Sequence, residues 1–243
     1  MHSWGLTDPG CVRAQNQDAF QIVQLDRNTL LGVVCDGMGG AKSGNIASAL
    51  AIDVFVQEVR RVHKSGMNRD QVEQMLRGAA KLANFTVFDQ AQQFEDFDGM
   101  GTTLVAAYIT PKQATIVNVG DSRCYLITRE GIRQITADHS LVQMMIRRGE
   151  LTVEQARTYP GKNYITRAVG TEPTVECDLF RQNLSKGEFL LMCSDGLHGV
   201  VDDQEILFEV VHGVNKENCC QRLLDIAKTR GAPDNVTALL VQA

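Results

Sequence analysis

Two acidic dipeptides end apolar runs in distant parts of the chain. The stretches LLGVVCDGMGG and FLLMCSDGLHG place Asp36 and Asp195 directly after strand-like runs. Asp18 in QNQDAF, Asp121 in VGDSR and Asp234 in PDNVT also lie at the edges of expected strands. Carboxylates that gather in a partly buried site repel one another unless they share protons or bind cations. Because oxygen ligands favour hard ions, convergence of these aspartates would indicate a Mg²⁺ or Mn²⁺ site.

A second interpretation of the same aspartates requires no chemistry. Asp-Gly is a favoured hairpin dipeptide, so each motif is also compatible with a simple turn. On spacing alone, the five aspartates are equally compatible with solvated turn residues. The two interpretations differ in whether the carboxylates converge in space.

The composition is that of an ordinary globular protein. The chain has 243 residues, of which 44% are hydrophobic and 22% charged, and its net charge is -5. This length suits one domain over residues 1–243, and the charge argues against nucleic acid or an anionic membrane as a partner. The N-terminal MHSWGLTDPG lacks secretory-signal features, so we expect a cytoplasmic protein. Seven cysteines without CxxC spacing indicate reduced thiols.

The hydrophobic periodicity predicts an α+β fold. Alternating or continuous apolar runs indicate strands, and apolar residues at helical spacing indicate two pairs of helices. The expected elements are strands at 2–8, 18–25 and 29–35, two helices between 43 and 94, strands at 101–110, 113–120, 123–129, 131–136, 175–183 and 188–193, helices at 203–212 and 217–230, and a strand at 235–241. This order does not alternate as βαβ units do, so it predicts antiparallel sheets with helices packed outside.

Residues 139–170 interrupt the strand pattern. They contain two short helical pieces followed by Pro160 and Gly161. We expect this segment to form a surface flap over a site and to help select substrates.

Eight motifs carry a resemblance to a known family. In chain order they are TDPGCVRAQNQDAF, VCDGMGG, GMGTTLVAA, VGDSRCY, ITADHS, YITRAVG, CSDGLHG and APDNVTALLV. Over nearly the whole chain, the sequence resembles the metal-dependent, type 2C serine/threonine protein phosphatases, and DGMGG and the flap resemble the bacterial branch. The resemblance implies a sandwich of two antiparallel sheets flanked by pairs of antiparallel helices. It also implies hydrolysis of phosphoserine and phosphothreonine on proteins.

The resemblance further implies two to three Mg²⁺ or Mn²⁺ ions and their ligands. Asp36 matches the carboxylate that bridges two metals, and Gly37 matches a residue that offers its backbone carbonyl to one of them. Asp195 and Asp234 match ligands of the other metal. Asp121, together with Asp195, matches the ligands of a third, weaker site in bacterial members.

Two more positions have implied roles in catalysis. Asp18 matches a carboxylate that holds metal-bound waters, and Arg13 matches the arginine that binds the substrate phosphate. A guanidinium suits that task because it is planar and permanently charged. The implied mechanism is direct attack by a metal-activated water, with Arg13 and Asp36 as catalytic residues. Met38 stands where other branches carry a histidine proposed as the general acid, so the acid is unassigned.

Several polar residues near these motifs have structural interpretations. We interpret His139 as a hydrogen-bonding group, Arg123 as an ion-pair partner, and Thr102 and Thr103 as ordinary strand residues. His198 follows the second Asp-Gly dipeptide and is compatible with either the site or the solvent.

Other functions were weighed against the phosphatase. A nucleotide-binding module is disfavoured because GMGGAK does not complete G-x-G-x-x-G and no P-loop motif is present. A cysteine-based phosphatase is excluded because no cysteine has an arginine six positions later. A catalytically weak, phosphoprotein-binding regulatory member of the same fold is a further alternative. The expected partners are proteins phosphorylated by a bacterial serine/threonine kinase, and we expect a monomer.

Overall fold

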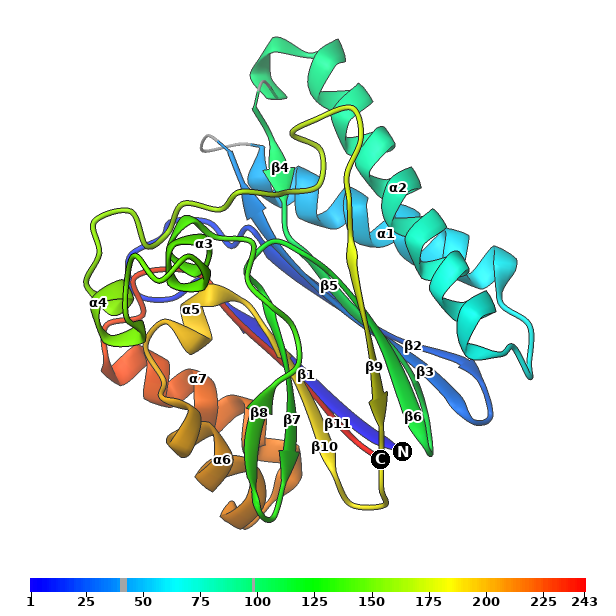
Figure 1. Ribbon diagram of the computed structural model, residues 1–243, viewed down its shortest axis with the longest axis vertical. Coiled ribbons are helices and arrows are strands. Elements are labelled where there is room, and N and C mark those ends of the chain that lie inside the picture. Colours follow the sequence, from blue (N-terminus) through cyan, green and yellow to red (C-terminus); the bar gives the residue numbers. More distant parts are fainter. Residues whose placement is uncertain (40–42, 98) are drawn as a thin grey trace.

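Two antiparallel β-sheets packed face to face form the centre of the computed structural model, which describes residues 1–39, 43–97 and 99–243 (Figure 1). The five-stranded sheet has the order β1 (His2–Asp8), β11 (Val236–Gln242), β10 (Phe189–Cys193), β7 (Arg123–Thr128) and β8 (Gly131–Gln134). The six-stranded sheet has the order β2 (Asp18–Asp26), β3 (Thr29–Met38), β5 (Leu104–Thr110), β6 (Gln113–Val119) and β9 (Asp178–Asn183), and β4 (Gly101–Thr102) pairs with β3. The predicted α+β sandwich is confirmed.

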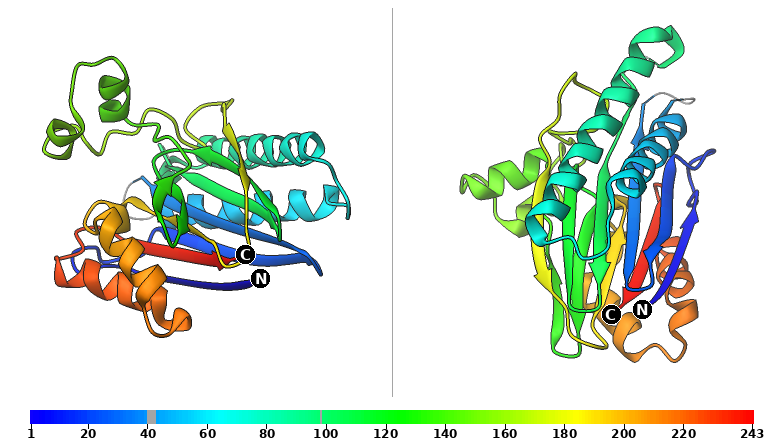
Figure 2. Two further views of the ribbon diagram at one scale, coloured as in Figure 1. Left: turned by 60° about the horizontal axis from the view of Figure 1, so that its bottom comes forward. Right: turned by 90° about the vertical axis from the view of Figure 1, so that its right-hand side faces the viewer.

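A pair of helices covers the outer face of each sheet (Figure 2). The helices α1 (Gly44–Val62) and α2 (Arg69–Gln93) pack on the six-stranded sheet, and α6 (Asp203–His212) and α7 (Cys219–Thr229) pack on the five-stranded sheet. A third apolar layer lies between the two sheets.

Strand β3 explains why its sequence is a continuous apolar run. Leu31 and Val33 face the helices α1 and α2, whereas Leu30 and Val34 face the other sheet. All four side chains are buried because both faces of the strand are covered. The strand is therefore packed on both of its faces before the chain reaches Asp36.

Neither Asp-Gly dipeptide forms a hairpin turn. Asp36 and Gly37 continue β3, and Asp195 begins the one-turn helix α5 (Asp195–His198). The simple-turn interpretation is therefore wrong for both motifs. Gly40, the last residue of the first motif, lies outside the described residues.

Several other element boundaries differ from the prediction. The single strand expected at 101–110 is divided into β4 and β5 at Thr103, where the amide of Asp36 donates to the Thr103 hydroxyl. Strand β9 begins at Asp178, three residues later than the expected start at 175.

The flap segment leaves and re-enters the fold at one narrow base. It contains α3 (Leu141–Arg147) and α4 (Val153–Arg157). At the base, the amide of Leu141 donates to the oxygen of Tyr164 over 2.8 Å, and the amide of Thr166 donates to the oxygen of His139 over 2.7 Å. Figure 2 shows the flap projecting away from the sheets.

None of the helices in the described part of the chain combines the length and the apolar character that a membrane crossing requires.

Shortening a side chain between β3 and the helices should weaken the whole fold. We expect Leu31→Ala to lower the free energy of unfolding by about 3 kcal/mol, because Leu31 is fully buried and its loss leaves a cavity. Urea denaturation would measure the change. The matched control Leu82→Ala, on the exposed face of α2, should change it by less than about 0.5 kcal/mol. Equal losses in both variants would contradict this assignment of the core.

Candidate active site

The antiparallel pairing brings the predicted aspartates to one end of the sandwich. Asp18 begins β2 and lies directly opposite Asp36, near the end of β3. Asp195 follows the end of β10, and Asp234 precedes the start of β11, the antiparallel neighbour of β10. Asp121 lies in the turn between β6 and β7. Where one strand ends, its antiparallel neighbour begins, so all five aspartates lie at the same edge.

The backbone of Asp36 is fixed by the two threonines of the GTT motif. The hydroxyl of Thr102 donates to the carbonyl oxygen of Asp36 over 2.8 Å, and the amide of Asp36 donates to the Thr103 hydroxyl over 2.9 Å. The Thr103 hydroxyl also contacts the Ser122 hydroxyl at 2.7 Å, beside Asp121. Thr102 is a strand residue as predicted, and both buried threonines also hold the backbone of Asp36, a role that the sequence did not indicate.

Asp18 connects the two sheets. Its Oδ2 atom accepts hydrogen bonds from the hydroxyls of Ser194 at 2.6 Å and Thr237 at 2.7 Å. Both hydroxyls belong to the five-stranded side of the sandwich, whereas Asp18 belongs to β2. Ser194 and Thr237 had no predicted role, although each lies inside a motif that carries the family resemblance.

Two glycines allow backbones to approach closely at this end. A side chain on Gly196 would meet the backbone oxygen of Asn235 at 1.9 Å, and one on Gly37 would meet the oxygen of Gly44 at 2.1 Å. Gly196 thus lets α5 lie against the start of β11, which brings Asp195 near Asp234. The glycine in each Asp-Gly dipeptide is required for packing rather than for a turn.

Burial and mutual repulsion raise the pKa values of four carboxyl groups. Burial is the main cause in each case, and it raises the pKa of both Asp18 and Asp121 to about 7. The pKa of Asp36 lies well above its ordinary value, and the charges of Asp18, Asp195, Asp121 and Asp234 add to the effect of burial. The pKa of Asp195 is raised by burial and then by Asp234. The carboxylates converge, and the interpretation as solvated turn residues is wrong.

Arg13 lies over this cluster on the loop that joins β1 to β2. Its Nη2 atom is 2.7 Å from Oδ2 of Asp234, and just over half of its side chain is exposed. The hydrogen bond to Asp234 raises the pKa of Arg13, and the charges of Asp195 and Asp36 raise it further. The guanidinium is thus placed where it contacts both the solvent and the negative site.

Asn235 ties the Arg13 loop to β11. Its Nδ2 atom donates to the backbone oxygens of Pro9 and Gln15, both at 2.9 Å, and its Oδ1 accepts from the amide of Gln17 at 2.8 Å. Asn235 is buried, and the sequence analysis assigned it no role. Its position directly after Asp234 in PDNVT was the available signal.

The residues present fit hard divalent cations. The cluster offers only oxygen donors, and the Oδ1 atoms of Asp18 and Asp195 are buried without a hydrogen-bond partner in the described structure. Such orphaned oxygens are costly unless a cation or an ordered water satisfies them. Within residues 1–39, 43–97 and 99–243, no three acidic, histidine or cysteine side chains are already arranged as a metal site. Metal binding would therefore require the carboxylates to adjust, with Asp234 turning from Arg13.

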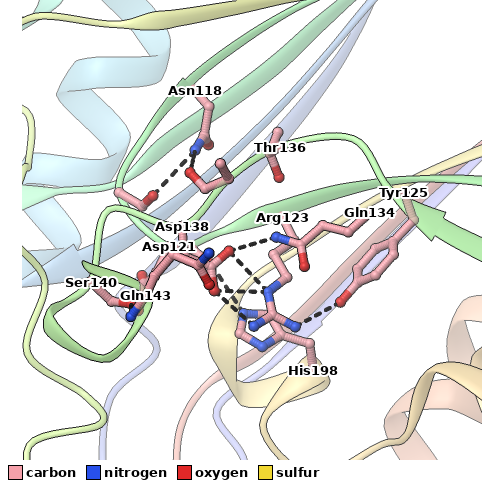
Figure 3. A network of polar contacts seen from close by, with 12 residues as sticks. Asn118, Asp121, Arg123, Tyr125, Gln134, Thr136, Asp138, Ser140, Gln143 and His198 are labelled. Atoms are coloured by element: carbon pink, nitrogen blue, oxygen red, sulfur yellow. Dashed lines mark hydrogen bonds and ion pairs between the residues drawn. The ribbon is translucent and has the colours of Figure 1, made fainter. Parts of the chain in front are cut away.

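A polar network surrounds the turn that carries Asp121 (Figure 3). Arg123 forms an ion pair with Asp138 at 2.7 Å, and the amide of Gly120 donates to Nδ1 of His139 at 3.0 Å. The structural interpretations of Arg123 and His139 are confirmed. His198 faces this network rather than the solvent, and its Nε2 atom lies 3.1 Å from the backbone oxygen of Asp121.

The raised pKa of Asp18 predicts a pH-dependent stability in the metal-free protein. In the unfolded chain this carboxyl ionises near its ordinary value of 3.8, but in the folded protein only near about 7. The fold therefore loses stability as the pH rises between these values, because the charged form is buried. Asp18→Asn removes this loss while keeping an oxygen that accepts from both hydroxyls.

Thermal unfolding with excess EDTA would test this expectation. The melting temperature of Asp18→Asn should exceed that of the wild type at about pH 8, and the gap should narrow as the pH falls towards about 4.5. Exposed Asp53→Asn is the control and should show no such trend. A gap that stays constant with pH would contradict the assigned burial of charge.

Comparisons with known proteins identify the family of this chain. The family described as protein phosphatase 2C matches residues 12–226. Serine/threonine phosphatase stp from Listeria monocytogenes is 35% identical over 242 residues, which cover 100% of this chain and 96% of the relative. Protein phosphatase PhpP from Streptococcus pneumoniae is 34% identical over 236 residues, which cover 97% of this chain and 95% of the relative.

Solved structures resemble the fold closely. The crystal structure of serine/threonine phosphatase Stp1 from Staphylococcus aureus superposes with a TM-score of 0.93 at 38% identity, covering 99% of this chain and 94% of that chain. The serine/threonine phosphatase of S. agalactiae gives a TM-score of 0.93 at 30% identity, covering 100% and 99%. The match extends over the sheets, both helix pairs and the aspartate-bearing strand ends. The chain belongs to the protein phosphatase 2C family.

Proposed function

We propose that this protein hydrolyses phosphoserine and phosphothreonine on proteins, with water as the nucleophile and Mg²⁺ or Mn²⁺ bound by the carboxylate cluster. The observation that carries the proposal is the convergence of buried, mutually repelling carboxylates beside an exposed arginine. The names of the relatives support the substrate class, since they are serine/threonine phosphatases.

The proposed ligands hold two to three ions. Asp36 would bridge two ions, with the Gly37 carbonyl as a further ligand of one and with Asp195 and Asp234 as ligands of the other. Asp121 and Asp195 would hold a third, more weakly bound ion. When bound, such ions make a water molecule nucleophilic near neutral pH and offset negative charge on the phosphate. The backbone bonds around Asp36 support its role as the bridging ligand, because they prevent its strand end from shifting.

Asp18 and Arg13 act on water and phosphate in this proposal. One oxygen of Asp18 is held by two hydroxyls, which leaves its Oδ1 atom to orient a water in the site. Arg13 would exchange its exposed ion pair with Asp234 for the substrate phosphate, whose oxygens match the planar guanidinium. Exposed ion pairs contribute little stability, so this exchange costs little.

The biological setting is proposed on the same basis. We expect residues 1–243 to act as one catalytic domain, with the flap at 139–170 helping to select phosphorylated proteins. We also expect the protein to be a monomer that works in the cytoplasm against a serine/threonine kinase. The similarity to bacterial phosphatases over almost their full lengths supports the single catalytic domain.

Removal of metal should abolish turnover. We expect EDTA to eliminate hydrolysis of a phosphothreonine peptide and Mn²⁺ to restore it, because the nucleophile depends on the ions. Asp36→Asn should lower kcat/KM by at least about 100-fold, as expected for a lost bridging ligand, with Asp53→Asn as the matched control. Phosphate release measures both. Persistent turnover in EDTA would refute the mechanism, whereas binding of the phosphopeptide without turnover would favour the regulatory alternative.

Substitutions of Arg13 should distinguish the effect of its positive charge from the effect of its planar guanidinium. We expect Arg13→Ala to lower kcat/KM by about 100-fold through loss of a charge-stabilising donor, and Arg13→Lys to recover only part of it. Arg27→Ala, an exposed change on the β2–β3 hairpin, is the control. Steady-state kinetics on the same peptide give the result. Full activity in Arg13→Lys would exclude bidentate binding of the phosphate by the Arg13 guanidinium.

A further inference from the structure

Asp121 and Asp195 lie just beyond the last paired residues of two neighbouring strands. Strands β7 and β10 are antiparallel partners, and their ladder ends where Arg123 lies opposite Cys193. Asp121 precedes Arg123 by two residues, and Asp195 follows Cys193 by two. The sheet therefore brings both carboxylates to the same end, but its hydrogen bonds do not extend to them. Their separation has to be set by another contact.

His198 supplies a contact across this gap. It is the last residue of α5, whose first residue is Asp195, and its Nε2 atom lies 3.1 Å from the backbone oxygen of Asp121. A carbonyl can only accept a hydrogen bond, so Nε2 carries the proton and donates it. One imidazole thus links the helix that carries one carboxylate to the backbone of the other.

Both ends of this link are anchored. Leu197 is fully buried in the apolar layer under α6 and α7, and the amide of Gly199 donates to the oxygen of Asp195 over 2.7 Å, so α5 cannot shift easily. On the other side, His139 binds both polar backbone atoms of Gly120. Rigid anchors make the length of the His198 hydrogen bond a determinant of the geometry between them. Figure 3 shows His198 beside Arg123 and Asp121.

We propose that His198 is a positioning residue that sets the spacing between Asp121 and Asp195, and thereby the affinity of this pair for a divalent cation. The inference rests on the proposed third ion site and deepens it. His198 touches neither substrate nor the reacting atoms. It acts through the backbone of Asp121, as outer groups do when they orient the ligands of a metal.

Two amide variants distinguish loss of the hydrogen bond to Asp121 from a general effect of replacing His198. In His198→Gln, the side-chain amide can occupy the place of Nε2 and donate to Asp121. In His198→Asn, an equally neutral amide is one methylene too short. Comparison of the two controls for loss of the ring, and His212→Ala, an exposed histidine on α6, controls for histidine removal elsewhere.

Isothermal titration of the full chain with Mn²⁺ is the measurement. We expect His198→Asn to weaken the lowest-affinity Mn²⁺ site by about tenfold, and His198→Gln to restore it to within about threefold of the wild type. Asp121→Asn should remove that site, and adding His198→Asn to it should cause no further loss. Thermal unfolding of each variant confirms that it is folded.

Different failures refute different claims. If Asp121→Asn abolishes the weak site but His198→Asn binds Mn²⁺ as the wild type does, the role of His198 is refuted while the third site stands. The role of His198 is also refuted if His198→Gln binds Mn²⁺ no better than His198→Asn does. It is refuted as well if adding His198→Asn to Asp121→Asn weakens Mn²⁺ binding as much as His198→Asn alone does. If Asp121→Asn leaves the isotherm unchanged, both the third site and the role of His198 are refuted.

Discussion

The structure depends on keeping mutually repelling carboxylates together at one end of the sandwich. Asp36 has a raised pKa because of burial and because four other aspartates surround it. Such a cluster would spread apart if its backbone were free to move. Three apolar layers pack against the strands that carry the cluster, and the aspartates lie at the end of these layers. The packed core keeps the strand ends in place despite the repulsion between the carboxylates.

Neutral donors and acceptors do much of the local positioning. Threonine hydroxyls hold the backbone of Asp36, and the hydroxyls of Ser194 and Thr237 hold the carboxylate of Asp18. These groups fix geometry without adding net charge to a site that is already negative. Arg13, a cation in direct contact with the cluster, is by contrast exposed and held by an ion pair with Asp234. Fixed acids and an exchangeable arginine suit a site that retains metal and releases phosphate.

Hydrogen bonds join the base of the flap to the turn that carries Asp121. His139 belongs to the base of the flap and also holds Gly120, the neighbour of Asp121. Its other ring nitrogen lies 3.2 Å from Asp178 at the start of β9. A displacement of the flap base would therefore also displace the turn that carries Asp121. The geometry of the site and the position of the flap are not independent.

The fold class, the helix pairs and the set of aspartates could be predicted from the sequence. Periodicity and turn residues record which faces are buried, and the order of motifs identified the family. The contacts that hold those aspartates could not be predicted and were found in the folded protein. The roles of Thr102, Ser194, Asn235 and His198 depend on hydrogen bonds between distant strand ends. A polar residue in a motif has the same appearance whether it faces water or a neighbouring backbone, because its partner is chosen by packing rather than by its position along the chain.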